Sequence, residues 1–188
     1  MAVMRRSYEI VTERLGFRAW KSEDLKAFAK LNADPVVMEY FPSTLSEAET
    51  GGLIERNIAD FKEKGYGLWA VDELETSDFV GYIGFHDATF ESFFTPCVEI
   101  AWRLGFEYWG KGYATEGALA CLERGFNKLG FEKVYSFTAK VNQRSENVMK
   151  KIGMSKVGEF NHPAVEKESK LHRHVLYRIQ KDELFGGI

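Results

Sequence analysis

The segment from Trp109 to Thr115 combines two glycines with the expected start of a helix. Gly110 and Gly112 allow a tight turn and leave backbone N–H groups uncovered, because glycine has no side chain and tolerates positive φ angles. A helix that begins near Gly112 directs the positive end of its dipole at the same place. Such a loop binds anions, and a phosphate or pyrophosphate is the ligand we expect.

Glu99 is the residue best suited to act as a general base. It is a carboxylate in the otherwise apolar segment from Val98 to Leu104, where burial would raise its pKa towards the values that proton transfer requires. Histidine is the other side chain that titrates near neutral pH. The alternative bases are His86, His162, His172 and His174.

Two other phosphate-binding loops match these residues incompletely. A P-loop would use Gly105 and Gly110, but Gly112 stands where a Ser or Thr hydroxyl should hold magnesium. A dinucleotide-binding loop would begin at Gly110, but Thr115 occupies the position of its third glycine. Neither signature is complete, so neither kind of nucleotide site is favoured.

Periodic apolar residues and capping signals predict the elements that would hold these groups. Strands are expected at residues 15–20, 68–71, 79–88, 98–104, 133–141, 156–160 and 171–179. Helices are expected after a Ser22 cap, at residues 36–40, from Ser46 to Lys64, from Gly112 to Phe126 and from Asn142 to Gly153. The strands and helices alternate, which predicts a mixed α/β sheet with helices on its faces.

The chain has 188 residues, 45% of them hydrophobic, and a formal net charge of −3. This length favours one domain over residues 1–188, and the acidic balance disfavours nucleic acid and suits a cationic acceptor. We expect no membrane segment, because no window of about 18 apolar residues occurs. With only Cys97 and Cys121 and no secretory signal, the chain suits the cytoplasm, and we expect no metal site.

The loop from Trp109 to Ala114 resembles the pyrophosphate loop of the GNAT N-acetyltransferase superfamily, whose pattern is Gln/Arg-x-x-Gly-x-Gly/Ala. Trp109 departs from this pattern at the first position, which leaves the backbone cradle possible without that side-chain contact. A second segment, from Asn142 to Met154, follows a predicted strand and resembles the family's Asn-x-x-Ser/Ala helix that ends in Gly-Phe/Met. The two segments occur in the family's order, and the resemblance extends from Leu15 to Arg178.

Within the superfamily, the chain most resembles the RimJ/RimL-like branch, the ribosomal-protein alanine N-acetyltransferases. The residues that carry this similarity are the opening Thr12 to Leu15, the strand from Glu99 to Trp102 and the loop from Tyr108 to Glu116. The resemblance implies a GNAT-like fold, in which a mixed, mostly antiparallel sheet is flanked by helices and its splayed central strands hold coenzyme A. It also implies acetyl-CoA as the co-substrate, without a metal.

The resemblance further implies which residues contact acetyl-CoA. The strand before the loop would lie beside the pantetheine arm, the loop would hold the pyrophosphate, and the Asn-x-x-Ser helix would contribute its first turn. The implied contacts are Trp102, Arg103, Leu104, Trp109, Gly110, Lys111, Gly112, Tyr113, Ala114, Thr115, Asn142 and Ser145.

The implied reaction is direct attack of an amine on the thioester in a ternary complex. Many family members place a Tyr general acid at the eighth position of the Asn-x-x-Ser/Ala helix, but Met149 occupies it here. Ser145 is then the residue expected near the thioester sulfur, and since a thiol has a pKa of about 8.5, one hydroxyl hydrogen bond can suffice for thiolate departure. Glu99 is the expected base. A non-catalytic acyl-CoA-binding module is the alternative that the missing Tyr leaves open.

The weak set of candidate bases favours an acceptor that loses its proton easily. An N-terminal α-amine has a pKa of about 7.7 to 8.0, whereas a lysine amine titrates at about 10.4. We therefore expect a protein or peptide N-terminus, with a polyamine, an amino metabolite or an aminoglycoside-like drug as the alternative. Glu91, Phe93 and Phe94 lie between two strands and would line the acceptor cleft, or form an ordinary hairpin or a dimer contact. The chain would then be a monomer or a homodimer.

Overall fold

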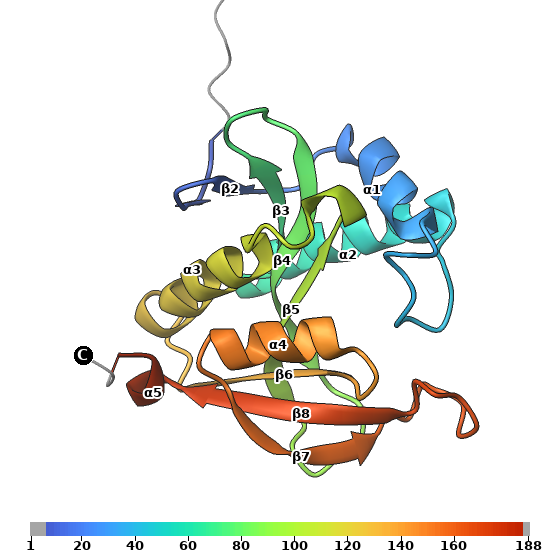
Figure 1. The fold of residues 1–188 in the computed structure, drawn as a ribbon. Coiled ribbons are helices and arrows are strands. Elements are labelled where there is room, and N and C mark those ends of the chain that lie inside the picture. The colour runs from blue at the N-terminus through green and yellow to red at the C-terminus, as the bar shows by residue number, and fades with distance from the viewer. Residues whose placement is uncertain (1–6, 186–188) are drawn as a thin grey trace, which may run out of the picture.

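The computed structural model describes residues 7–185. Within this range, eight strands form one sheet in the order β1-β2-β3-β4-β5-β6-β8-β7 (Figure 1). The strands are β1 (Ile10–Val11), β2 (Leu15–Arg18), β3 (Leu68–Glu73), β4 (Phe79–Ala88), β5 (Cys97–Leu104), β6 (Lys133–Ala139), β7 (Ser155–Asn161) and β8 (Arg173–Gln180). The helices are α1 (Asp24–Ala33), α2 (Glu47–Lys64), α3 (Tyr113–Asn127), α4 (Gln143–Lys151) and α5 (Lys181–Phe185), with a 3-10 turn, η1, at Phe106–Tyr108.

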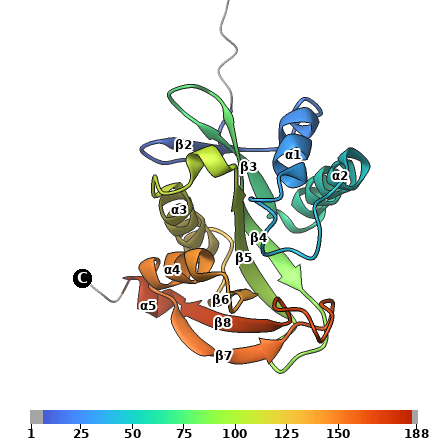
Figure 2. The same cartoon turned by 45° about the vertical axis from the view of Figure 1, so that its right-hand side comes forward.

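The sheet is divided between β5 and β6. The neighbouring strands are antiparallel except for these two, which are parallel and, in the described residues, pair only at Glu99 and Tyr135. Beyond that pairing the strands diverge, and the two halves of the sheet run at a steep angle to each other (Figures 1 and 2). Ser136 fastens the junction, because its hydroxyl donates to the Ile100 carbonyl oxygen over 3.0 Å. The prediction of a mostly antiparallel sheet with splayed central strands is confirmed.

α3 and α4 cover one face of the sheet (Figure 2). The apolar stripe of α3, which includes Ala118 and Leu122, packs against Ile83 and Ile100 of the central strands. Gly117 lets α3 approach the sheet closely, since a Cβ at this position would lie 2.3 Å from the Ile83 side chain. The N-terminal half of α3 is thereby held directly against β4, the neighbour of the diverging strand β5.

α1 and α2 cover the opposite face, where Phe28 and Leu31 pack against Ala70 and Tyr82. Each large apolar side chain contributes about 1.5 to 3 kcal/mol when it is fully buried. Side chains alternate between the two faces along a strand. In β5, residues 100 and 104 therefore face α3, whereas residues 99, 101 and 103 face α1 and α2.

Most predicted elements are confirmed within one or two residues at each end. Ser46 and Glu49 form a capping box at the start of α2, and Gly65 ends that helix with a φ of 77°. Asn142 caps α4 as expected, because its side chain accepts a hydrogen bond from the Ser145 N–H. None of the described helices combines the length and the apolar character that crossing a bilayer requires.

Two predicted helix features are wrong. α1 begins at Asp24 without a Ser22 cap, and the Asp24 carboxylate instead accepts a hydrogen bond from the Lys21 N–H over 2.8 Å. Residues 36–40 form turns rather than a helix. The chain bends there at Asp34, whose carboxylate accepts a hydrogen bond of 2.8 Å from the backbone two residues further on.

Candidate active site

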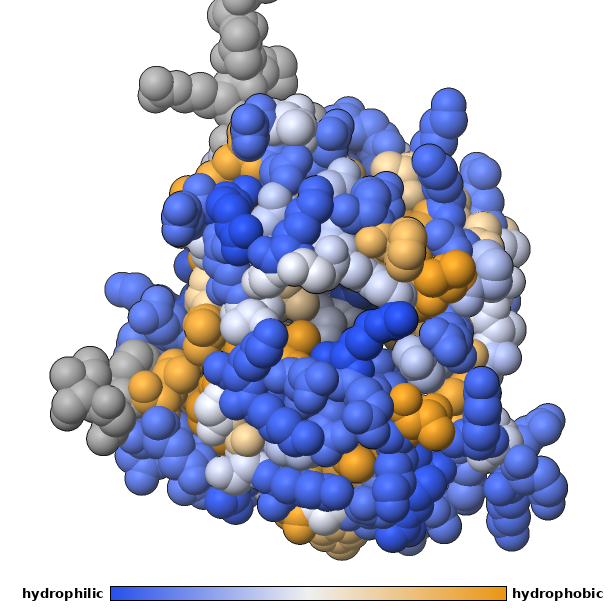
Figure 3. All heavy atoms as spheres, in the orientation of Figure 1, coloured by the Kyte–Doolittle hydropathy of each residue, from blue (hydrophilic) through white to orange (hydrophobic). Residues whose placement is uncertain are grey.

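A cleft of about 1240 Å³ opens where β5 and β6 diverge. Figure 3 shows the surface hollowed between the β1–β5 half and the β6–β8 half of the molecule. Its lining comes from both faces of the sheet, so the cleft connects the α3 side with the α1 and α2 side. The predicted site residues that line it are Glu99, Trp102, Arg103, Leu104, Trp109, Gly110, Gly112, Tyr113, Ala114, Thr115, Asn142 and Ser145.

The glycine loop at the start of α3 has the geometry of an anion site. Gly110 and Gly112 have φ angles of 74° and 85°, and Gly112 is the residue before the first turn of α3. In the part of the chain that the structure describes, the N–H groups of residues 112–115 donate to no backbone or side-chain acceptor. These residues line the cleft, so their N–H groups and the helix dipole remain candidates for the anion contact that the sequence predicts. Lys111 itself does not line the cleft.

The loop is fastened on both sides. Trp109 Nε1 donates to the Leu104 carbonyl oxygen over 2.9 Å, and Arg14 Nη1 donates to the Lys111 carbonyl oxygen over 2.9 Å. Because these bonds join the loop to β5 and to the chain just before β2, its backbone is preorganised for a ligand.

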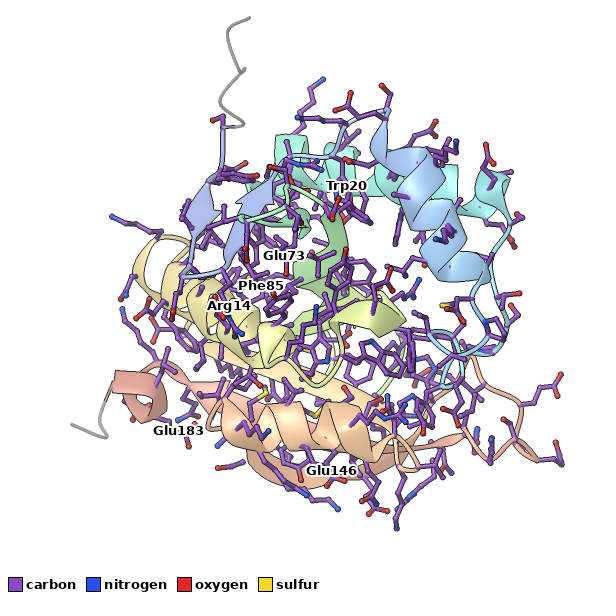
Figure 4. All side chains as sticks on the ribbon, turned by 45° about the horizontal axis from the view of Figure 1, so that its top comes forward. Arg14, Trp20, Glu73, Phe85, Glu146 and Glu183 are labelled. Carbon is purple, nitrogen blue, oxygen red and sulfur yellow. The ribbon has the colours of Figure 1, made fainter. Side chains whose placement is uncertain are left out.

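The side chain of Tyr113 is part of this fastening. Its hydroxyl donates to Glu73, and the Arg14 guanidinium lies 4.7 Å from the centre of its ring. Figure 4 shows Arg14 and Glu73 near each other at the start of α3. Tyr113 is only 6% exposed, so its contact with an anion comes from the backbone rather than from the hydroxyl.

Glu99 lies opposite His86 in the β4–β5 pairing. The Glu99 Oε2 and His86 Nε2 atoms are 2.8 Å apart, and Glu99 is 5% exposed. Glu99 is therefore buried, as expected, but a second titratable group that was not expected beside it faces it. Burial alone would lower the pKa of His86, but the Glu99 carboxylate outweighs this effect and raises it to about 9.

The protonation state of this pair decides which partner can accept a proton. At neutral pH, His86 already carries its proton, so it is not available as the alternative base. Glu99 lies inside the cleft, and its side chain contacts this cation. Of the two, Glu99 is thus the group that can take a proton from a ligand.

We expect the pair to make stability depend on pH. The pKa of His86 is raised from the ordinary value of about 6.5 to about 9 in the folded protein, so its contribution is complete below pH 6.5 and is lost as the pH rises through 9. Since 38% of the His86 side chain is exposed, screening limits the contribution to about 1 kcal/mol. Urea denaturation of the protein and of His86→Gln at about pH 6 and about pH 9.5 measures it. An equal loss of stability in both proteins would contradict the pairing.

The other histidines lie at the far end of the cleft or outside it. The rings of His162 and His174 are 4.9 Å apart and line the cleft beside Phe137. Burial lowers the pKa of His174 to about 4 and also lowers the pKa of His162. His172 does not line the cleft, and its Nδ1–H donates to the Val165 carbonyl oxygen over 2.8 Å.

The first turn of α4 forms the wall opposite the glycine loop. Asn142 Nδ2 donates to the Thr138 hydroxyl over 3.0 Å, which orients the cap. Ser145 lines the cleft, and within the described residues its hydroxyl makes no hydrogen bond. Met149 is fully buried in the core beneath α4. The side chain at the family's usual acid position therefore does not reach the cleft.

The residues between β4 and β5 that were predicted to bind the acceptor, Glu91, Phe93 and Phe94, do not line the cleft. Phe94 is 8% exposed and packs in a separate aromatic cluster with Phe160, whereas Phe93 is 71% exposed. Glu91 is absent from the lining as well, and Phe90 is the aromatic residue of this segment that lines it. The sequence pattern does not reveal which of these rings lines the cleft, because that depends on how the loop packs against Phe160 of β7.

Several cleft residues were not predicted. Arg144, in the first turn of α4, places its guanidinium 4.8 Å from the centre of the Trp109 ring. On the opposite face, Tyr82 and Arg56 line the cleft. The contact between His86 and Glu99 could have been anticipated from the sequence only through the β4–β5 hairpin, whose register places the two residues opposite each other.

Comparison with known proteins shows similarity to acetyltransferases over most of the chain. The family model described as an acetyltransferase (GNAT) domain matches residues 14–155. YkkB of Bacillus subtilis (strain 168), described as an uncharacterized protein, is 33% identical over 154 residues, which cover 80% of this chain and 87% of YkkB. YnaD of the same strain, described as an uncharacterized N-acetyltransferase, is 31% identical over 152 residues, which cover 80% of this chain and 85% of YnaD.

A solved structure has the same fold. The crystal structure of an acetyltransferase (GNAT family) from Bacillus anthracis superposes with a TM-score of 0.77 at 28% identity, over 93% of this chain and 99% of that one. The splayed strands, the anion loop at the start of α3 and the family match agree. The chain therefore belongs to the GNAT acetyltransferase family and is an acetyl-CoA-dependent N-acetyltransferase.

Proposed function

We propose that the donor and the acceptor approach Glu99 from opposite faces of the sheet. The observation that carries this proposal is the cleft itself, which joins the glycine loop on the α3 side to the Glu99–His86 pair on the α1 and α2 side. In this arrangement the pyrophosphate binds the N–H groups of residues 112–115, and the pantetheine arm runs along β5 beside Trp102 and Leu104. The thioester then lies between Glu99 and Ser145.

The reaction proceeds by direct attack in a ternary complex. The amine nitrogen forms a bond with the thioester carbonyl carbon, the carbon–sulfur bond breaks, and the amine proton passes to Glu99 directly or through water. Ser145 donates a hydrogen bond to the departing thiolate. Backbone N–H groups along the splayed edge of β5 stabilise the carbonyl oxygen, and donors of this kind are worth about 3 to 4 kcal/mol each.

Arg144 supports the donor half of this proposal. The first position of the family's loop pattern holds Gln or Arg, but here it holds Trp109. The Arg144 guanidinium lies over the Trp109 ring and therefore returns a cation to nearly the same place from another element. A guanidinium matches a phosphate in geometry as well as in charge. Arg144 thus takes over the side-chain contact with the pyrophosphate.

Replacing Arg144 with glutamine is expected to weaken acetyl-CoA binding about tenfold, because one charge-assisted hydrogen bond to phosphate is lost. Isothermal titration measures the change. Binding of S-acetylpantetheine, which has no pyrophosphate, serves as the internal control and is expected to be unaffected. In the Arg144→Gln background, Trp109→Arg is expected to restore acetyl-CoA affinity. Equal weakening of both ligands would refute this role for Arg144.

We further propose an N-terminal α-amine as the acceptor, as in the RimJ/RimL-like branch. In this proposal residues 1–188 form a single acetyltransferase domain. Glu99 is a weak base held beside a cation, and an α-amine with a pKa of about 7.7 to 8.0 is already partly neutral at cellular pH. A solved ribosomal-protein-S5-alanine acetyltransferase from Vibrio fischeri shares the fold, with a TM-score of 0.74 at 16% identity. The alternative is a small amine, since the spermidine N(1)-acetyltransferase of Escherichia coli (strain K12) is 27% identical over 151 residues.

The test is an acetylation assay that measures thiol release with two acceptor sets. One set contains peptides with free N-termini, each paired with the same peptide blocked at its N-terminus, and the other contains spermidine and related polyamines. Release that requires the free N-terminus supports the proposal. Turnover of polyamines without turnover of peptides would replace the α-amine with a small-amine acceptor, and acetyl-CoA binding distinguishes either result from an inactive preparation.

A further inference from the structure

Arg103 is a buried cation on the acceptor side of the cleft. It is 9% exposed, it lines the cleft, and its side chain lies on the face covered by α1 and α2. Its Nη1 donates to Asn32 Oδ1 over 2.6 Å. Among the described residues, no carboxylate forms an ion pair with Arg103, and its buried Nε has no hydrogen-bond acceptor.

A guanidinium that is nine-tenths buried normally has a carboxylate partner, because burial of an unpaired charge is costly. Arg18 in the same protein shows the usual arrangement, since it is 3% exposed and pairs with both Asp24 and Asp72. Arg103 has only the neutral amide of Asn32. Within residues 7–185, no carboxylate balances its charge, so a ligand could supply one.

The guanidinium of Arg103 is also held in one orientation. Its Cζ lies 4.1 Å from the centre of the Phe41 ring and 5.3 Å from that of Tyr82. The Asn32 amide that accepts from it is fixed in turn, because its Nδ2 donates to the Thr50 hydroxyl over 3.1 Å. A fixed guanidinium fork is suited to bind a carboxylate through two hydrogen bonds.

The carboxylates that line the cleft are already engaged. Glu99 pairs with His86 at 2.8 Å, and Asp60 and Asp87 both pair with Lys64, at 2.7 Å and 3.0 Å. None of them is paired with Arg103. Although the whole chain has a net charge of −3, this part of the cleft presents an unbalanced positive charge to a ligand.

We propose that Arg103 is the anion-binding end of the acceptor site, so that the acceptor is an amine that also carries a carboxylate. Glu99 and Arg103 lie on the same face of β5, four residues apart, which corresponds to about 13 Å between their Cα atoms. In an extended peptide whose α-amine lies at Glu99, an acidic side chain within the first four residues spans this distance. The inference deepens the proposed function and rests on it for the position of the amine.

The test uses acceptor pairs that differ only in one carboxylate. Peptides with Glu at position 2, 3 or 4 are compared with the matching Gln peptides, and lysine is compared with cadaverine. The wild-type enzyme is expected to favour the acidic member of a pair about tenfold in kcat/KM, since one charge-assisted contact is made only there. Arg103→Gln is expected to abolish that preference, because kcat/KM then falls mainly for the acidic member of each pair.

Two further variants distinguish a direct contact between Arg103 and the acceptor carboxylate from a general effect of the substitution on the cleft. Arg103→Lys keeps the charge and is expected to retain part of the preference, which also covers the case in which Arg103→Gln does not fold. Arg56→Gln removes another cation that lines the cleft, from α2, and is expected to leave the preference in place. Equal losses for acidic and uncharged acceptors in Arg103→Gln would show that Arg103 only holds Phe41, and would overturn the inference.

The kinetics of these acceptor pairs distinguish the role of Arg103 from the proposal that the acceptor is an α-amine. If only small amines turn over, the α-amine proposal fails, and the lysine and cadaverine pair still tests Arg103. If no acceptor turns over, titration of the CoA-loaded enzyme with the acidic and neutral peptides replaces kinetics. Equal binding of the two, or no binding of any acidic member, would overturn the assignment of Arg103.

Discussion

Replacing Glu99 with glutamine is expected to lower kcat about a hundredfold, because a positioned general base contributes about 10²- to 10⁴-fold. The substitution keeps the size of the side chain and its hydrogen bond to His86 but removes the group that accepts the amine proton. Acetyl-CoA binding is expected to stay within about twofold, since the glycine loop at residues 112–115 supplies the main anion contacts. Steady-state kinetics at saturating acetyl-CoA and isothermal titration measure the two quantities.

The matched control is His86→Gln, which leaves the Glu99 carboxylate in place. This variant is expected to lose about tenfold or less in kcat, because it removes a neighbouring cation and not the base itself. If Glu99→Gln and His86→Gln lose equal activity, the pair acts as a structural unit. A normal kcat in Glu99→Gln would exclude Glu99 as the base. The amine would then lose its proton to water or to the substrate itself.

Replacing Arg18 with methionine is expected to lower the free energy of unfolding by about 3 to 5 kcal/mol. Arg18 joins β2 to α1 and β3, because it forms two-pronged hydrogen bonds of 2.7–2.8 Å with both Asp24 and Asp72. All three side chains are at most 4% exposed. Removing the guanidinium leaves two carboxylates buried without the cation that balances them. Urea denaturation followed by circular dichroism measures the loss.

Arg14→Met provides the control for this experiment. Arg14 pairs with Glu116 at 2.6 Å, but its side chain is 42% exposed, and exposed ion pairs contribute about 1 kcal/mol or less. A triple replacement of Arg18, Asp24 and Asp72 by apolar residues is expected to recover part of the stability, because no unpaired charge remains. Equal destabilisation by Arg18→Met and Arg14→Met would contradict the buried network.

The fold was largely predictable because local signals and tertiary structure agree. The apolar strands, the capping box at Ser46 and the glycine loop before α3 each depend on neighbours in sequence, so periodicity and cap chemistry were sufficient. The helix expected at residues 36–40 is replaced by turns that follow Asp34, whose carboxylate accepts a hydrogen bond from the Val36 N–H. A run of apolar residues with helical spacing does not reveal such a side-chain hydrogen bond, which favours a turn.

The candidate site was predictable where it is built from one continuous segment. The predicted residues of the glycine loop, except Lys111, and the predicted residues Asn142 and Ser145 at the start of α4 line one cleft. The partners of charged side chains were not predictable, since His86 meets Glu99 only through the β4–β5 register and Asn32 on α1 meets Arg103 on β5 only through tertiary packing. Pairing between distant residues requires the three-dimensional arrangement, which composition and periodicity do not contain.

The single pairing at Glu99 and Tyr135 leaves few backbone hydrogen bonds between the two halves of the sheet. Amide protons along the facing edges of β5 and β6 are therefore expected to exchange with solvent through local openings, at free energies below that of global unfolding. A ligand that contacts both edges suppresses such openings by mass action. If acetyl-CoA binds between these edges as proposed, it is a structural element as well as a reactant, because it replaces strand pairing that β5 and β6 lack.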